Sequence, residues 1–268
     1  MSRRDQYRAG VPCFVETLTP DLDAALRFYE GVFGWTFAGP GPMPGDPPGA
    51  YFVARVDDDD VAGIGSLLPD TPAPVGWSTH VAVASADQAA AGAVDAGGSV
   101  VLEPFDVPPA GRLAVIADPA GATFCVWEAG ARPGAARVNE PSAWAMSLLR
   151  TPDPAGAEAF YGALFGWRAE PFGPDGGGAW LWRLPGYVGG EPSQPVPRDV
   201  VAAMMADDAP PAGWGVDFWV ADTDAAVAPA AELGGRVVAE PFSEPMFRRA
   251  VLAAPDGATF SISQLQLG

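Results

Sequence analysis

The pattern of apolar and polar residues divides the first half of the chain into two runs of elements with the same order. Each run begins with an alternating segment that predicts a strand, continues with apolar residues at helical spacing, and ends in further strands. The first helix is expected from Asp21 to Gly34, and the second over 87–96, where Gly97-Gly98 ends it. The expected strands are 14–18, 51–56, 61–67, 79–84, 113–116 and 122–127, with the acidic residues 57–60 in a solvated hairpin turn.

Short motifs recur in the second half of the chain in the same order. Thr19-Pro20-Asp21 returns as Thr151-Pro152-Asp153, and Phe33-Gly34-Trp35 returns as Phe165-Gly166-Trp167. Changes in the displacement between motifs fall in Gly/Pro-rich stretches, where loops accept insertions. The repeat predicts two copies of one domain, over residues 1–129 and 143–268, joined by a polar linker over 130–142.

The charged residues exclude several classes of function. Acidic residues number 33 against 15 basic ones, giving a net charge of −18, which argues against nucleic acid or an anionic membrane as a partner. All basic residues are Arg, so no lysine can form a Schiff base. His80 is the only histidine, which excludes multi-histidine metal motifs and requires any Ser-His or Cys-His chemistry to use this residue.

The number of cysteines and the hydropathy of the chain indicate the cellular compartment in which the protein is expected. Cys13 and Cys125 are far apart and too few for a disulfide framework, so we expect free thiols. The first residues contain no apolar leader core, and no run of about 18 apolar residues follows. We therefore expect a cytoplasmic protein.

The spacing from Asp21 through Phe28-Tyr29 to Phe33-Gly34-Trp35 resembles the vicinal oxygen chelate superfamily, which includes glyoxalase I, bleomycin-resistance proteins and extradiol dioxygenases. With Gly97-Gly98 and Asp118–Phe124, the chain resembles the tandem two-domain actinobacterial branch labelled 27 kDa antigen or hydroxylase. This resemblance implies an α+β fold of two tandem glyoxalase-like domains. Each domain would consist of two βαβββ modules whose strands form a curved sheet, or cup.

The resemblance also implies metal ligands at inward-facing strand positions. In the first copy these positions fall on Phe14, His80, Cys125 and the apolar run Ala62–Gly65. In the second copy they fall on Met146, Asp217 and Ser261. A centre of this type needs three or four converging donors, so we expect no metal and no other cofactor. A soft ion held by Glu16, His80 and Cys125 is the alternative.

Period-two alternation predicts which side chains line the cups. Aromatic walls with a few polar groups suit a flat, partly polar organic ligand. The expected ligand-binding residues are Phe14, Glu16, His80, Cys125 and Trp127 in the first copy, and Met146, Arg150, Trp180, Trp182, Asp217, Trp219 and Ser261 in the second. Three of them also have structural explanations: His80 as an interior histidine, Cys125 as a small buried side chain, and Arg150 as a structural ion-pair partner of Asp217.

Two hypotheses for the function follow. The first is metal-independent binding of a hydrophobic or aromatic small molecule, such as an antibiotic or secondary metabolite, for sequestration or for delivery to a pathway oxygenase. The alternative is an enzyme of the isomerase, cyclase or lyase type that uses Glu16 and His80 as an acid–base pair without metal. Either a monomer or a homodimer agrees with the tandem repeat. The sequence leaves the ligand and the choice of cup open.

Overall fold

The computed structural model describes residues 3–43, 48–68, 76–173, 178–189, 197–209 and 211–266. The first half contains β1 (Pro12–Thr19), α1 (Leu22–Phe33), β2 (Thr36–Met43), β3 (Gly49–Val56), β4 (Asp59–Ser66), β5 (Gly76–Val83), α2 (Ala86–Asp95), β6 (Ser99–Val107), β7 (Gly111–Ala117) and β8 (Thr123–Ala129). The second half contains β9 (Trp144–Thr151), α3 (Pro154–Phe165), β10 (Arg168–Pro171), β11 (Ala179–Arg183), β12 (Val200–Ala206), β13 (Gly213–Trp219), α4 (Thr223–Val227), β14 (Arg236–Glu244), β15 (Phe247–Ala253) and β16 (Thr259–Leu265). Among the described residues, no helix has the length and apolar character needed to cross a bilayer.

Two eight-stranded mixed sheets repeat one topology. The first has the order β2-β3-β4-β1-β5-β8-β7-β6, and the second has the corresponding order β10-β11-β12-β9-β13-β16-β15-β14. In each sheet the two modules meet at an antiparallel pair, β1 with β5 and β9 with β13. The prediction of an α+β fold with two βαβββ modules in each copy is confirmed. The domain boundaries at 129 and 143 stay a prediction.

The repeated motifs begin and end the first helix of each copy in the same way. The side chain of Asp21 accepts a hydrogen bond from the backbone N–H of Ala24 at 3.0 Å, and Asp153 accepts one from Gly156 at 2.9 Å. The helices end at Gly34 and Gly166, whose φ angles of 70° and 75° are left-handed and favour glycine. Local sequence therefore sets the length of both helices.

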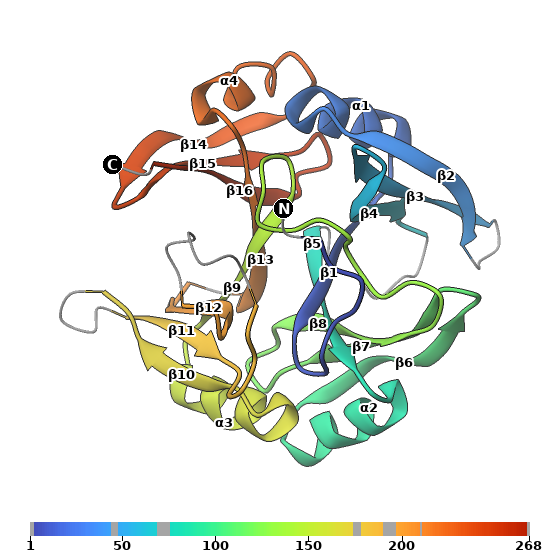
Figure 1. The fold of residues 1–268 in the computed structure, drawn as a ribbon, viewed down its shortest axis with the longest axis vertical. Coiled ribbons are helices and arrows are strands. Elements are labelled where there is room, and N and C mark those ends of the chain that lie inside the picture. The colour runs from blue at the N-terminus through green and yellow to red at the C-terminus, as the bar shows by residue number, and fades with distance from the viewer. Residues whose placement is uncertain are drawn as a thin grey trace.

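The helices of the two copies pack against each other. Helix α1 contacts α4, and α2 contacts α3, so each pair joins one module from each copy. Figure 1 shows these pairs at opposite ends of the molecule, with β1, β5, β9 and β13 between them. Close packing here needs glycine: a Cβ on Gly235 would lie 2.4 Å from the Phe28 ring, and one on Gly98 would lie 2.7 Å from the Phe160 ring. The apolar cores therefore extend across both copies.

The segment expected as a linker is tied to the first sheet. The backbone N–H of Ala135 donates to the carbonyl of Cys13 at 2.8 Å, and that of Ala136 donates to the carbonyl of Asp60 at 2.7 Å. The indole of Trp127 donates to the carbonyl of Arg132 at 2.8 Å. These bonds hold this part of the chain against β1, β4 and β8.

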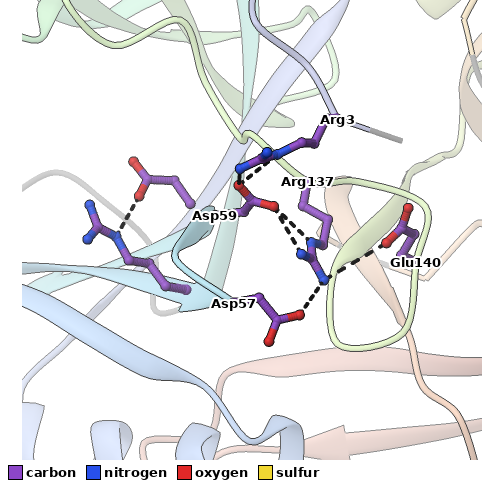
Figure 2. A network of polar contacts seen from close by, with 7 residues as sticks. Arg3, Asp57, Asp59, Arg137 and Glu140 are labelled. Carbon is purple, nitrogen blue, oxygen red and sulfur yellow. Dashed lines mark hydrogen bonds and ion pairs between the residues drawn. The ribbon is translucent and has the colours of Figure 1, made fainter. Parts of the chain in front are cut away.

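The acidic turn 57–60 is not fully solvated, in contrast to the expectation from sequence. Asp59 is only 4% exposed, and its carboxylate accepts hydrogen bonds from Arg137 and from Nε of Arg3, the latter at 3.0 Å. Arg137 also pairs with Asp57 and Glu140 (Figure 2). The hydrogen bond from Arg3 and the contacts with Arg137 outweigh burial and lower the pKa of Asp59. This cluster joins the N-terminal segment, the β3–β4 turn and the segment leading to β9.

We expect Asp59→Asn to lower the free energy of unfolding by about 1–3 kcal/mol, because two guanidinium groups lose a charged acceptor. Asp58→Asn is the matched control, since Asp58 is exposed and its φ of 69° suits asparagine. Urea denaturation at neutral pH compares the two variants. Equal stability of both variants would contradict a structural role for Asp59.

Candidate functional site

The first cup is the face of the first sheet that carries Phe14, Glu16, His80, Cys125 and Trp127. His80 on β5 lies opposite Phe14 on β1 and opposite Cys125 on β8, because both neighbouring strands pair with β5. Donor atoms of Glu16, His80 and Cys125 all lie within 4.8 Å of one another. The structure thus brings together the three polar side chains that the sequence predicted for this cup.

A tyrosine that the sequence pattern did not single out completes this polar group. The hydroxyl of Tyr51 on β3 donates to Oε2 of Glu16 at 2.8 Å, while Oε1 of Glu16 lies 3.2 Å from Nε2 of His80. Tyr51 reaches Glu16 by lying across β4 at Gly63 and Gly65, where a Cβ would come within 1.8 Å and 2.9 Å of its side chain. Two glycines at alternate positions of β4 were the available sequence signal for a side chain crossing this strand.

Aromatic rings flank the histidine on two sides. The centroid of the Phe14 ring lies 5.8 Å from that of His80, and the Trp127 ring lies 6.3 Å away, both in edge-to-face geometry. The His80 side chain is 4% exposed and that of Glu16 is 14% exposed, so Glu16 marks the more open side of the pair. Phe14, Trp127 and Cys125 are buried. The arrangement is a nearly closed apolar site with one charged pair.

Glu16 and His80 each stabilise the charged form of the other. Burial favours neutral His80, but the neighbouring Cys125 sulfur and Glu16 carboxylate favour the cation more and raise the pKa of His80 to about 10. Burial would also raise the pKa of Glu16, but the His80 charge and the hydrogen bonds from His80 and Tyr51 outweigh it and lower that pKa. Nε2 of His80 faces Oε1 of Glu16 at 3.2 Å, and Nδ1 is buried without a hydrogen-bond partner among the described residues. The imidazole therefore has donor capacity that a ligand can use.

The metal centre implied by the family resemblance does not fit these residues. Phe14 places a ring edge against His80 at one ligand position, and Gly63 on β4 offers no donor. The space that a side chain at Gly63 would enter holds the Tyr51 hydroxyl. Three donors remain close together, but the four-donor arrangement typical of the fold is absent from the described part of the first cup.

The second cup is the face of the second sheet that carries Met146, Arg150, Asp217, Trp219 and Ser261. The predicted Arg150–Asp217 ion pair is wrong: Arg150 is exposed and pairs with Asp207 at 3.3 Å. Asp217 instead contacts Arg249 at 3.2 Å and accepts a hydrogen bond from Ser263 at 2.7 Å. Burial raises the pKa of Asp217 despite these two partners.

The structure also shows the neighbours of three other residues predicted to line the second cup. Met146 and Ser261 are the register partners of Asp217 on the neighbouring strands, and Met146 also lines a cavity of about 70 Å³ beside the N-terminal segment. Trp219 is half-buried, with its ring 6.2 Å from that of Phe247. Their role in ligand binding stays a prediction. The second cup has no counterpart of the Glu16–His80 pair, because Leu148 and Asp217 occupy the corresponding positions.

Trp182 does not belong to a ligand site. It is fully buried, with its ring 5.7 Å from both Tyr161 on α3 and Trp167. Trp180, two residues away on the same strand, is half-buried and packs against the same core. Both indoles therefore face helix α3 rather than the second cup, and their assignment as ligand-binding residues is wrong.

Comparisons with known proteins agree with this architecture. Residues 14–126 match the Glyoxalase/Bleomycin resistance protein/Dioxygenase superfamily, and residues 134–263 match a glyoxalase-like domain. The chain is 36% identical over 267 residues to a Mycobacterium tuberculosis protein named "Putative glyoxylase CFP32", covering 98% of this chain and 97% of that protein. It is 33% identical over 277 residues to the anthracycline biosynthesis protein DnrV of Streptomyces peucetius, covering 98% and 96%.

Solved structures show the same fold at low sequence identity. A Mn(II)-bound glyoxalase from Novosphingobium aromaticivorans superimposes with a TM-score of 0.61 at 19% identity, covering 97% of this chain and 83% of the other. An extradiol ring-cleaving dioxygenase from B. fuscum gives a TM-score of 0.63 at 14% identity, covering 99% and 75%. With two matching domains and relatives aligned over nearly their whole length, this chain belongs to the glyoxalase/bleomycin resistance protein/dioxygenase superfamily.

Proposed function

We propose that the first cup binds an aromatic small molecule of secondary metabolism without a metal ion. The observation that carries this proposal is the replacement of a four-donor centre by the Tyr51–Glu16–His80 group between the rings of Phe14 and Trp127. The charged imidazole can donate to a carbonyl oxygen of the ligand, and Glu16 can accept from a hydroxyl. Ring edges and faces supply the apolar contact area for a flat molecule.

The relatives narrow the class of ligand. DauV and DnrV, which align with nearly the whole chain, are named as anthracycline biosynthesis proteins. We extend this to the present chain as part of the proposal: its ligand is a polycyclic aromatic molecule that carries carbonyl and hydroxyl groups. A ligand of this kind would enter on the side of Glu16, which is the more exposed partner of the ion pair. Delivery of the ligand to a pathway oxygenase belongs to the same proposal.

Titration of the protein with anthracycline-type aromatic compounds, followed by Trp fluorescence, tests this function. We expect saturable quenching that persists after dialysis against a chelator, because Trp127 lines the site and no metal takes part. Trp127→Leu should remove a large part of the quenching and weaken binding about tenfold or more, in line with the loss of an aromatic contact in a buried site. Phe172→Ala is the control, since Phe172 is an exposed side chain. Absence of saturable quenching across the panel, or its loss with the chelator, would contradict the proposal.

Catalysis by the same pair is the second candidate function, and the burial of Glu16 against a cationic imidazole favours it. His80 would protonate a carbonyl oxygen and Glu16 would remove a proton from carbon or oxygen, as in isomerisation or cyclisation. His80→Gln separates the two functions. Loss of turnover with binding retained supports the enzyme, whereas a change in binding with no turnover in the wild-type protein supports the carrier.

A further inference from the structure

Cys125 lies in an arrangement that the proposed binding function does not require. It is the register partner of His80 on the adjacent parallel strand β8. Its sulfur, a His80 ring nitrogen and a Glu16 oxygen all lie within 4.8 Å of one another. A thiol beside an imidazole that a carboxylate supports is the arrangement of nucleophilic cysteines. Nε2 of His80 faces Oε1 of Glu16 at 3.2 Å, and Nδ1 has no hydrogen-bond partner among the described residues.

The rest of the chain provides an internal comparison. Cys13, the other free cysteine, is completely buried, and burial raises the pKa of its thiol. In the second cup the corresponding positions carry Asp217 and Ser261, so neither a thiol nor an imidazole is present there. The thiol–imidazole–carboxylate group is confined to the first cup among the described residues.

We propose that Cys125 is a nucleophilic thiol that adds to an α,β-unsaturated carbonyl compound bound in the first cup, with His80 as its proton donor. This inference rests on the proposed function for the entry of an organic ligand into the cup. The His80 imidazole lies close enough to the sulfur to exchange a proton with it, and sulfur is a soft nucleophile suited to the β-carbon of an enone. Glu16 acts as a positioning residue, because its carboxylate keeps the imidazole charged and oriented.

The proposed step is a balanced addition. The thiolate sulfur forms a bond to the β-carbon, and the electron pair of the carbon–carbon double bond moves to the carbonyl as an enolate. The imidazolium of His80 then gives its proton to the enolate. Sulfur and hydrogen have added across the double bond, and the product is a thioether without any oxidant or leaving group.

N-ethylmaleimide, a small α,β-unsaturated carbonyl compound, tests this reaction without the natural ligand. The measurement uses the Cys13→Ala variant in the presence of a chelator, with the labelled cysteine identified by peptide mass. We expect labelling of Cys125 in the folded protein. Adding His80→Gln to this variant should slow labelling at pH 6.5 on the order of tenfold. The ratio of the rate at pH 6.5 to that at pH 8.5 should also fall, because the variant lacks the His80 proton donor.

Two controls make the outcome decisive. The Cys125→Ala variant retains Cys13 and should stay unlabelled until it is denatured. The folded state of each variant is checked by circular dichroism, and Glu16→Gln provides a second variant should His80→Gln not fold. Labelling of Cys125 only after denaturation, or equal rates and pH ratios with and without His80, would overturn the inference. A protein that binds aromatic ligands but leaves Cys125 unlabelled keeps the proposed function and loses only this reaction.

Discussion

Replacement of Trp182 by alanine should lower the free energy of unfolding by about 3–5 kcal/mol, as for other buried Trp-to-Ala substitutions. The side chain is fully buried, and its ring lies 5.7 Å from those of Tyr161 and Trp167. Removal of the indole would leave a cavity between β11 and helix α3, because the Tyr161 and Trp167 rings that pack against it are themselves buried. Urea denaturation followed by circular dichroism measures the loss.

Trp180→Ala is the matched control for this prediction. Trp180 is on the same strand and the same face but is half-buried, so the loss should be clearly smaller. Neither substitution should change the affinity for an aromatic ligand, since both indoles face helix α3. A variant at Trp182 that kept wild-type stability and lost ligand binding would show that this residue lines a pocket after all.

Much of the first cup could be predicted from the sequence. The alternation along β1 and β8 fixes which side chains share a face, and the helix motifs fix the start of each module. Phe14, Glu16, His80, Cys125 and Trp127 are neighbours because β1, β5 and β8 are adjacent in the sheet. The internal repeat also supports the prediction of the fold, because the same motifs occur in the same order in both copies and the two sheets have corresponding strand orders.

The contacts that cross strands could not be predicted in the same way. Tyr51 reaches Glu16 in a register that pairs it with Gly65 of β4, and alternation within one strand carries no information on this register. Strand β2 was missed because it contains Gly39-Pro40 and Gly41-Pro42, residues that are rare in central strands but accepted at a sheet edge.

Two errors in the second cup have different physical causes. Alternation places Trp180 and Trp182 on one face of β11 but does not say which face meets the helix, and no matching motif in the first copy settled the choice. Arg150 has a long side chain that can select among several carboxylates, and it turns outward to Asp207. Asp217 then pairs with Arg249 on β15, a residue that the sequence motifs did not connect with the cup.

The ion pair in the first cup should make a large contribution to stability. We expect Glu16→Gln to lower the free energy of unfolding by about 3–5 kcal/mol at pH 6, because the buried imidazolium of His80 loses its counter-charge. The glutamine can still accept a hydrogen bond from Tyr51, so the difference reports mainly on the charge. Thermal or urea denaturation of both proteins at a series of pH values gives the comparison.

The pH dependence of this difference follows from the direction of the Glu16 pKa shift. In the folded protein His80 and Tyr51 hold the pKa of Glu16 below its value in the unfolded chain. The stabilisation by Glu16 is therefore complete above the ordinary glutamate pKa, about 4.3, and is lost as the pH falls through the lower folded value. The stability curves of wild type and Glu16→Gln should be far apart at pH 6 and approach each other in acid. Glu158→Gln on the exposed side of α3 should show no such convergence. A constant difference at all pH values would mean that Glu16 stabilises the cup by its shape and not by its charge, and the acid–base and thiol chemistry proposed for this cup would lose its electrostatic basis.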